Sequence, residues 1–315
     1  MLEILYYIYN IQYSSKTIDS YHSRIFVRLT NILFYLVCKF QLGARYSSIK
    51  HSQKLNSSDK YIVSLTTFPK RINYVWLTVE SILRQKCKPD AIILWLSEQE
   101  FDKKKSLPKN LLKLEKRGLK IKFVEDNLMP HKKYYYTLKR YPKANIITID
   151  DDVIYPPSLI AELKKCHKQH PESICSTLTR IINAKNNSLQ SYKNWNMYDN
   201  EPRMSQRFLQ IGAGGVLYPN NSLHHEVLNK EVLKEKALKA DDLWLKIMAL
   251  KNDTSIVSLG YLYPRSFVPI IIEDNEQLME SNVHLGRNNK IFNELLDHYA
   301  LREKVIRLAK NESVQ

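Results

Sequence analysis

Short apolar runs alternate with amphipathic stretches from Tyr61 onward, and this alternation predicts the fold class. Four runs rich in Ile, Val and Leu have the character of strands buried in a sheet, and they cover residues 61–67, 91–97, 119–125 and 145–149. Residues 75–85 carry apolar side chains at helical spacing between the first two runs. Because helices between strands of one sheet imply right-handed crossovers, we expect an α/β fold with a mostly parallel sheet flanked by helices.

The carboxyl half of the chain is less regular. A helix over residues 158–169 and a strand over 173–178 continue the pattern, after which the alternation stops and a second functional region is expected. Apolar positions from Asn293 to Lys310 recur at helical spacing. They predict one final amphipathic helix, suited to packing with its apolar stripe and to facing a membrane with its charged side.

The amino-terminal stretch has a different character. Basic residues flank bulky apolar ones from Arg24 to Lys39, and the uncharged part after Arg28 is too short to cross a bilayer as a helix. A helix there either lies in a membrane interface or docks on the main domain, and both alternatives stay open. Residues 47–60 are polar and rich in Ser and Lys, as expected of a linker. The expected organisation is an N-terminal helical extension and linker over 1–59, a main domain over 60–290 and a C-terminal helix over 291–315.

The charge of the chain narrows its partners only slightly. Lys and Arg number 48 against 32 Asp and Glu, a net charge of +16, so the surface should attract anions such as nucleotide phosphates, anionic lipids or nucleic acid. The basic residues are dispersed, without an arginine-rich tail or a recognisable nucleic-acid module, and no nucleic acid is expected as a partner. The hydrophobic content of 44% is enough for a sizeable core.

The cysteines favour a reducing compartment, and with two histidines they raise the question of a zinc site. The four cysteines show no paired framework, and no signal peptide with a small-residue cleavage site opens the chain, so the cytoplasm is the simplest location. Cys166, His167, His170 and Cys175 suggest a zinc site, but their spacing lacks the close cysteine pair of known zinc ligands. Structural zinc is therefore not expected.

Three consecutive aspartates are the strongest chemical signal. Asp150, Asp151 and Asp152 directly follow the apolar run 145–149, so a buried strand would deliver them to its carboxyl end, where ligands bind in open α/β sheets. Carboxylates this close repel one another and are most useful when a divalent cation neutralises them. The alternative is a solvated turn in which the aspartates do no chemistry.

The order of these elements, with the helix end Ser81–Gln85 and the aspartate triplet, resembles the nucleotide-sugar half of GT-A-fold glycosyltransferases of bacterial capsule, exopolysaccharide and lipopolysaccharide synthesis. The resemblance covers residues 61–155 and implies a GT-A-like, Rossmann-like mixed sheet, with a nucleotide-sugar half over 60–156 and an acceptor half over 157–290. In that family an Asp-x-Asp motif holds a divalent metal that bridges the donor's two phosphates. The resemblance therefore implies Asp150 and Asp152 as ligands of Mn²⁺ or Mg²⁺, with Asp151 facing the donor's ribose or sugar.

Basic residues near this crevice would assist the departure of a nucleoside diphosphate, on which negative charge develops. His131, Lys132 and Lys133 lie between the third and fourth strands, and Arg71 follows the first. A solvated basic face is the alternative for each of them. The residues expected to bind the nucleotide sugar are Thr66, Arg71, Lys133 and Asp151. The segment 131–142 departs from the family, which commonly has an Asn-x-Gly-type segment there.

A second constellation lies in the carboxyl half. Of only 7 glycines, three crowd into residues 211–219, which indicates unusual backbone dihedrals, close approach to a ligand, or a structural turn. Asp241 and Asp242 open a predicted helix farther on and are either catalytic or simply favourable charges at a helix N-terminus.

Inverting GT-A enzymes have a glycine-containing acceptor loop before an acidic pair, and the order here is similar. The resemblance implies Asp242 as the general base and Asp241 as its neighbour at the acceptor, a task that an ionised carboxylate can perform. It likewise implies an acceptor role for Gly214 and Gly215, and a place in the metal shell for His284, for which a surface or hydrogen-bonded histidine is the alternative. Trp195 either stacks on an acceptor sugar or packs at the rim.

The expected function is metal-dependent, inverting transfer of a sugar from a nucleotide-diphosphate sugar to a glycan or lipid-linked acceptor in cell-surface polysaccharide synthesis. The expected location is the cytoplasm, peripheral at the inner face of the cell membrane, with an anionic membrane surface as a partner. A second hypothesis is a phosphoryl-transfer enzyme or nuclease in which Asp150, Asp152 and Asp242 hold two ions. A third is a non-enzymatic peripheral membrane scaffold.

Overall fold

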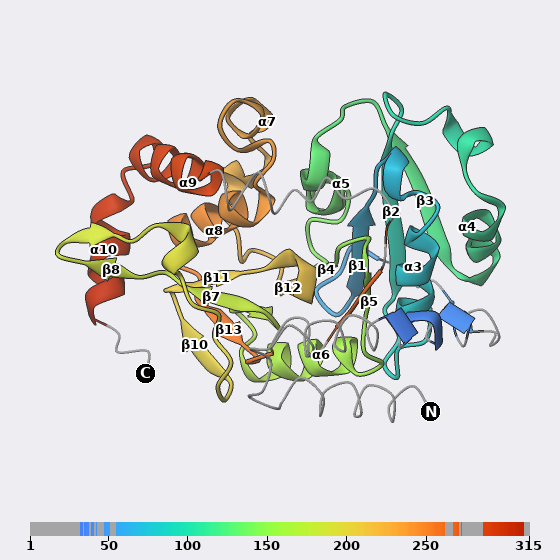
Figure 1. The fold of residues 1–315 in the computed structure, drawn as a ribbon, viewed down its shortest axis with the longest axis horizontal. Coiled ribbons are helices and arrows are strands. Elements are labelled where there is room, and N and C mark those ends of the chain that lie inside the picture. The colour runs from blue at the N-terminus through green and yellow to red at the C-terminus, as the bar shows by residue number, and fades with distance from the viewer. Residues whose placement is uncertain are drawn as a thin grey trace.

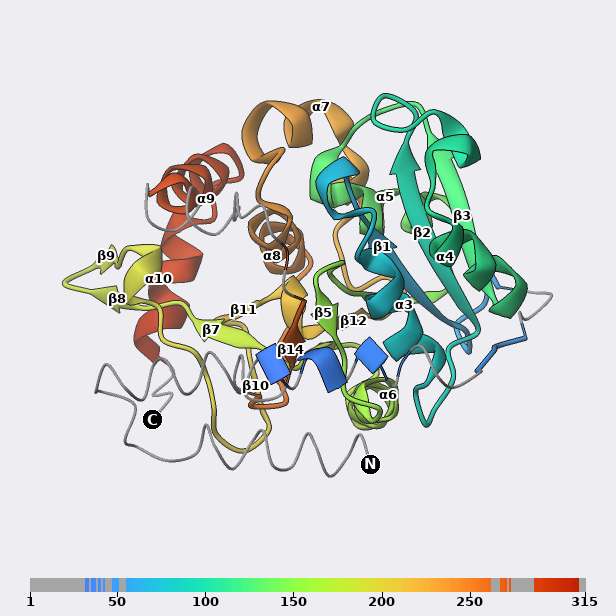
Figure 2. The same ribbon diagram turned by 45° about the vertical axis from the view of Figure 1, so that its right-hand side comes forward.

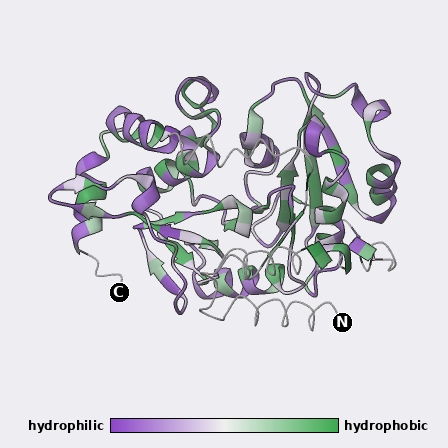
Figure 3. Cartoon of the chain, in the orientation of Figure 1, coloured by the Kyte–Doolittle hydropathy of each residue, from purple (hydrophilic) through white to green (hydrophobic). Residues whose placement is uncertain are grey.

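The computed structural model describes residues 32, 33, 35–37, 39, 40, 42, 47–50, 55–261, 267–270, 272 and 286–311. An eight-stranded sheet forms the centre of the molecule, in the order β10-β13-β6-β12-β4-β1-β2-β3 (Figure 1). Its central strands are among the most hydrophobic parts of the chain (Figure 3). The predicted α/β fold with a mostly parallel mixed sheet is confirmed.

The amino-terminal half of the sheet is parallel. Its strands are β1 (Tyr61–Thr66), β2 (Ala91–Ser97), β3 (Leu119–Val124) and β4 (Asn145–Thr148). Strand β1 pairs in parallel with both β2 and β4, and β2 pairs in parallel with β3. Three helices connect these strands, namely α3 (Val75–Leu83), α4 (Lys109–Lys113) and α5 (Lys132–Arg140).

Successive residues of β1 face opposite sides of the sheet, and different helices cover the two sides. Val63 and Leu65 belong to the cluster that holds the apolar face of α3, whereas Ile62 packs with Tyr136 of α5. The alternation of side chains along a strand therefore explains why helices cover both faces.

The carboxyl-terminal half makes the sheet mixed. Strand β12 (Val216–Tyr218) lies antiparallel between β4 and β6 (Ile174–Ser176). Strand β13 (Ile256–Ser258) runs parallel to β6, and β10 (Arg203–Ser205) is antiparallel to β13. The remaining elements are β5 (Val153–Ile154), α6 (Leu159–Gln169), β7 (Thr179–Ile181), β8 (Ala184–Lys185), β9 (Ser188–Leu189), β11 (Phe208–Gln210), α7 (Lys230–Val232), α8 (Asp241–Lys251) and β14 (Val268–Pro269).

The carboxyl-terminal segment forms two helices where the sequence predicted one. They are α9 (Arg287–His298) and α10 (Arg302–Asn311), and they lie near α8 at one end of the molecule (Figure 2). Ala300 separates them because its φ of 51° lies in the left-handed region, which no helical residue adopts. The apolar stripe of both helices packs inward, with Leu295 and Val305 buried in the same cluster.

The stretch before Lys60, predicted to be a linker, packs on the main domain in its described parts. Ile49 and Leu55 are buried in core clusters, and the Ile49 amide donates to the Arg117 carbonyl over 2.9 Å. Residues 1–31 lie outside the described part of the chain. Within the described residues, no helix has both the length and the apolar character that crossing a bilayer requires.

Candidate active site

The aspartate triplet lies at the carboxyl end of β4, as the sequence predicts. The Ile149 amide still donates to the Ser64 carbonyl of β1 over 3.2 Å, so the ladder ends just before Asp150. The Asp150 amide donates to the Tyr155 hydroxyl over 3.0 Å, and that hydroxyl donates to the Ala213 carbonyl over 2.9 Å. Tyr155 thereby joins the acidic turn to the glycine-rich loop.

Asp151 faces the interior of the protein. Its carboxylate accepts a hydrogen bond from the Thr67 hydroxyl and another from Arg71 Nη1 over 2.8 Å, and its side chain is 8% exposed. The expectation that Asp151 faces the donor is therefore corrected, because both of its oxygens serve the turn itself. Arg71 Nη1 also lies 2.8 Å from Asp152 Oδ2, so the predicted donor-binding arginine holds two neighbouring carboxylates.

Thr66 takes a different role from the predicted one. Its hydroxyl donates to the Trp95 carbonyl on β2 over 2.8 Å, which places it in the sheet. The next residue, Thr67, reaches the acidic turn instead. Since adjacent residues of an extended chain point in opposite directions, only one of the two threonines can do so.

Lys133 connects the two acidic groups of the chain. Its ammonium lies 2.6 Å from Asp150 Oδ1 and 2.8 Å from Asp241 Oδ2, and its side chain is only 5% exposed. The Ser64 hydroxyl of β1 donates to the Lys133 carbonyl and so fixes the start of α5 against the sheet. Burial alone would lower the pKa of Lys133, but the carboxylates of Asp150 and Asp241 outweigh burial and raise it, so the ammonium stays charged.

The other two basic residues of this segment do not reach the site. The His131 ring is fully buried, and because Nε2 donates to the Ala237 carbonyl over 2.8 Å, Nδ1 accepts from the Tyr134 hydroxyl. Burial lowers the pKa of His131 to about 4, so the ring is neutral. Lys132 is buried against Glu100 and Asn127, at 2.6 and 2.8 Å.

Asp241 and Asp242 begin α8, as predicted. Asp242 Oδ1 accepts a hydrogen bond from the Gly212 amide over 3.0 Å. A Cβ atom on Gly212 would lie 2.9 Å from Lys133 Nζ, 3.0 Å from Asp242 Oδ1 and 3.5 Å from Asp150 Oδ1. Gly212 therefore marks the point where the two acidic groups meet, and the sequence had not singled it out from its glycine neighbours.

Gly214 and Gly215 serve packing. A Cβ on Gly214 would lie 2.4 Å from Thr177 Oγ1, and Gly215 has a φ of +88° and lies against Leu159. Neighbouring protein atoms thus explain both glycines, and the predicted acceptor role finds no support in their surroundings.

Trp195 is not positioned to stack on a sugar. Its side chain is 2% exposed, its Nε1 donates to the Gln190 carbonyl over 2.9 Å, and its ring lies edge-on to Phe292 at 5.0 Å. The acceptor-stacking expectation is corrected, since the indole is part of the core. His284 lies outside the described residues, so its place in a metal shell stays a prediction.

The site holds more carboxyl groups than cations. Five carboxylates, those of Asp150, Asp151, Asp152, Asp241 and Asp242, surround two cations, Arg71 and Lys133. Burial and the neighbouring Asp151 charge raise the pKa of Asp152 to about 7, and burial and Asp241 raise that of Asp242 well above its usual value. Burial alone would also raise the pKa of Asp241, but the Lys133 ammonium outweighs burial and holds it below its usual value. The carboxylates are thus only partly neutralised by the protein.

A divalent cation fits this charge balance. Asp150 and Asp152 are the most exposed members of the triplet, at 31% and 32% of the side chain, and the ion pairs occupy Oδ1 of Asp150 and Oδ2 of Asp152. The second oxygen of each carboxylate lies outside these pairs. Among the described residues, a close group of three metal-ligand side chains occurs only at His224, His225 and Glu226, so an ion at the triplet would take further ligands from phosphate and water, as Mg²⁺ commonly does.

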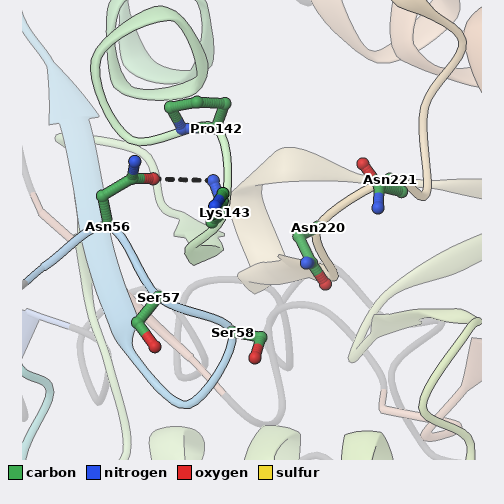
Figure 4. A pocket seen from close by; sticks show the side chains of 7 residues that line it. All are labelled: Asn56, Ser57, Ser58, Pro142, Lys143, Asn220 and Asn221. Carbon is green, nitrogen blue, oxygen red and sulfur yellow. Dashed lines mark hydrogen bonds between the residues drawn. The ribbon is translucent and has the colours of Figure 1, made fainter.

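A pocket of about 540 Å³ lies elsewhere (Figure 4). It is lined by residues that precede β1, precede β4 and follow β12, namely Asn56, Ser57, Ser58, Pro142, Lys143, Asn220 and Asn221. These are the amino ends of β1 and β4, whereas the aspartates follow the carboxyl end of β4. The pocket contains no carboxylate, so it lacks the chemistry of the acidic site.

Comparisons with known proteins give matches among solved structures alone. No protein-family profile and no curated protein matches the chain. Among solved structures, the chain is similar to residues 1–349 of S. aureus TarS, with 16% identity over 81% of this chain and 76% of that one, and a TM-score of 0.45. TarS in complex with UDP gives 14% identity over 76% and 71%, with a TM-score of 0.46. TarS with UDP-GlcNAc gives 13% identity over 81% and 76%, with a TM-score of 0.47.

Proposed function

We propose that this protein is a glycosyltransferase that moves a sugar from a nucleoside-diphosphate sugar to a glycan or lipid-linked acceptor in cell-surface polysaccharide synthesis. The observation that carries the proposal is the meeting of two acidic groups, Asp150 at the carboxyl end of β4 and the pair Asp241 and Asp242 at the start of α8. Lys133 contacts Asp150 and Asp241, and Asp150 and Asp242 both lie beside Gly212. Sugar transfer needs a cationic place for the leaving diphosphate beside a base for the incoming hydroxyl, and these residues offer both within one cluster.

The donor side of the site comprises the aspartate triplet and Arg71. Asp150 and Asp152 would hold Mn²⁺ or Mg²⁺, and the ion would stabilise the negative charge that develops on the diphosphate. Arg71 holds Asp151 and Asp152 in a fixed arrangement through two contacts of 2.8 Å. Such fixed carboxylates cost little reorganisation when a ligand binds.

The acceptor side comprises Asp242 and the groups that orient it. Asp242 takes the proton of the acceptor hydroxyl while the hydroxyl oxygen bonds to the anomeric carbon and the bond to the nucleotide diphosphate breaks. The Gly212 amide fixes one carboxylate oxygen. The raised pKa of Asp242, caused first by burial and then by Asp241, makes it a stronger base than an exposed aspartate. A single displacement assisted in this way inverts the anomeric configuration.

The phosphoryl-transfer hypothesis is less well supported by this geometry. It requires Asp150, Asp152 and Asp242 to share two ions. Lys133 lies between the two acidic groups, 2.6 Å from Asp150, with its side chain buried. A second ion at that position would have to displace a buried, charged ammonium.

The proposed place of action is the inner face of the cell membrane, where lipid-linked acceptors are available.

The experiment that tests the proposed reaction is a panel of nucleotide sugars assayed for thermal stabilisation in Mn²⁺ and in chelator, followed by transfer to candidate acceptors. A ligand that binds only the folded protein raises its unfolding temperature by mass action. The proposal predicts stabilisation by at least one nucleotide sugar in Mn²⁺ and its loss in Asp150→Asn. Stabilisation by none of them, or equal stabilisation in Asp150→Asn, would overturn it.

A further inference from the structure

Exposed apolar side chains gather on one short segment near the amino terminus. Among the described residues, five large hydrophobic side chains are exposed, and the fifth, Met204, lies far along the chain. The other four are Ile32, Leu33, Leu36 and Phe40, at 38%, 63%, 52% and 78% exposure. Figure 3 shows hydrophobic residues at this edge of the molecule.

These four residues share one face of a helix. Every described residue between 32 and 42 is helical, and at 3.6 residues per turn the four positions fall within an arc of roughly 100°. Tyr35 and Leu42 point elsewhere and are buried, at 5% and 1% exposure. The segment therefore has two apolar faces. One is buried against the protein, and the other is in contact with solvent.

The buried face anchors the segment to the catalytic domain. Tyr35 and Leu42 pack in one cluster with Leu77 of α3 and Ile154 of β5. The Leu42 carbonyl accepts a hydrogen bond from Arg84, which follows α3. Because these contacts hold one face of the segment, it cannot turn to bury the other, and the exposed face is part of the folded surface.

The sequence on either side of this segment carries charge of one sign. No acidic residue occurs between Asp19 and Asp59. The same stretch contains six basic residues, namely Arg24, Arg28, Lys39, Arg45, Lys50 and Lys54. Lys39 and Lys50 are exposed in the structure. An occupant of this surface must therefore offer apolar groups together with negative charge.

We infer that this face inserts into an anionic lipid surface, with Leu33 and Phe40 among the acyl chains and the neighbouring basic residues at the headgroups. Buried apolar area and electrostatic attraction to anionic lipid both contribute to such binding. A second copy of this chain is a poorer occupant, because it would bring an identical basic stretch and a net charge of +16 against the same charge.

This inference gives the proposed membrane location a defined surface, and it has a consequence for the site. Ile154, in the cluster with Tyr35 and Leu42, is two residues beyond Asp152. A membrane-bound segment would therefore hold the acidic turn at a fixed height above the lipid, which suits an acceptor whose carrier is embedded in the bilayer.

Vesicle co-sedimentation tests the inference. The full-length protein is mixed with phosphatidylcholine vesicles, with or without phosphatidylglycerol, and is compared with the double variant Leu33→Ser/Phe40→Ser. Met204→Ser is the matched control, because it removes one exposed hydrophobic side chain of 51% exposure from another place. We expect binding only to the anionic vesicles, and salt should weaken it. Binding should be unchanged in the control and about 10-fold or more weaker in the double variant, because two side chains that would be buried in lipid are lost.

Other results would overturn the inference. They are no binding to anionic vesicles, equal binding to neutral ones, or full binding by a double variant whose unfolding temperature equals that of the wild type. A double variant that changes from dimer to monomer in light scattering without losing vesicle binding would identify the face as a contact between copies. Nucleotide-sugar stabilisation, measured in the same samples, should be equal in all three proteins. Its absence with intact vesicle binding would count against the proposed reaction alone.

Discussion

Lys133 lies 2.8 Å from Asp241, a residue that belongs to the opposite half of the site, and its ammonium also contacts Asp150 at 2.6 Å. One buried cation therefore compensates carboxylates on both the proposed donor side and the proposed acceptor side. A substitution on either side should therefore change the electrostatic environment of the carboxylates on the other side through this shared contact.

Neutralising the proposed metal ligands should abolish transfer while the fold is retained. Asp150→Asn and Asp152→Asn keep the size of the side chain but remove the charge that a divalent cation requires. We expect no measurable sugar transfer and no Mn²⁺-dependent thermal stabilisation, with an unchanged circular dichroism spectrum. Asp199→Asn, at an exposed position outside the site, is the control. Wild-type transfer by either variant, or in the presence of chelator, would remove the metal from the mechanism.

Asp242→Asn should separate binding from chemistry. An amide cannot take the acceptor's proton, so the transfer rate should fall about 10²-fold or more while donor affinity stays near the wild-type value. Calorimetry of donor binding beside single-turnover transfer measures both quantities. Near-normal transfer would refute the base assignment, and a product with the donor's anomeric configuration would point to a retaining mechanism.

Lys133→Met should destabilise the protein and make its stability more dependent on a bound metal ion. Removing one partner of a buried ion pair leaves uncompensated carboxylates, which costs about 3 kcal/mol of unfolding free energy. Urea unfolding at neutral pH measures this loss, and Mn²⁺ should restore part of it by replacing the missing charge. Lys105→Met, at an exposed position, should have no comparable effect. Equal stability of both variants would show that Lys133 is dispensable to the site.

The metal-free protein should lose stability as pH rises toward neutrality. Asp152 has a pKa of about 7 in the folded protein, raised first by burial, whereas an unfolded aspartate has a pKa of about 3.9. Between these two pKa values the folded state binds more protons than the unfolded state, so the contribution of Asp152 to the free energy of unfolding falls with increasing pH. Urea unfolding in chelator at about pH 5 and about pH 7.5 should show this decline, and Asp152→Asn should reduce it. A decline of the same size in Asp152→Asn would assign the effect to other groups, such as Asp242.

The sequence predicts those parts of the site that depend on local pattern. The apolar run before Asp150 identifies a buried strand, and the apolar residues after Asp242 identify a helix, so both acidic groups were placed at the correct ends of their elements. The contact of Lys133 with both groups was not predictable, because it depends on how α5 and α8 pack in three dimensions. No periodicity in one chain carries that information.

Other errors have equally physical causes. Trp195 in a polar sequence was expected at a surface, but its indole is buried against Phe292, a residue far away in the chain. Thr66 and Thr67 are identical in type, and only the direction of each side chain decides which one reaches Asp151. The break between α9 and α10 occurs at Ala300. Because alanine has a high helix propensity, the sequence does not predict a break there.

Strand β12 also determines which motions are open to the molecule. It is hydrogen-bonded to β4 on one side and to β6 on the other, so one uninterrupted sheet runs through both halves of the protein. A hinge that opened the halves like a jaw would have to break those backbone hydrogen bonds. The hydrogen bonds of β12 oppose an opening of that kind, so the loops that surround the acidic residues are the parts that can move without breaking the sheet.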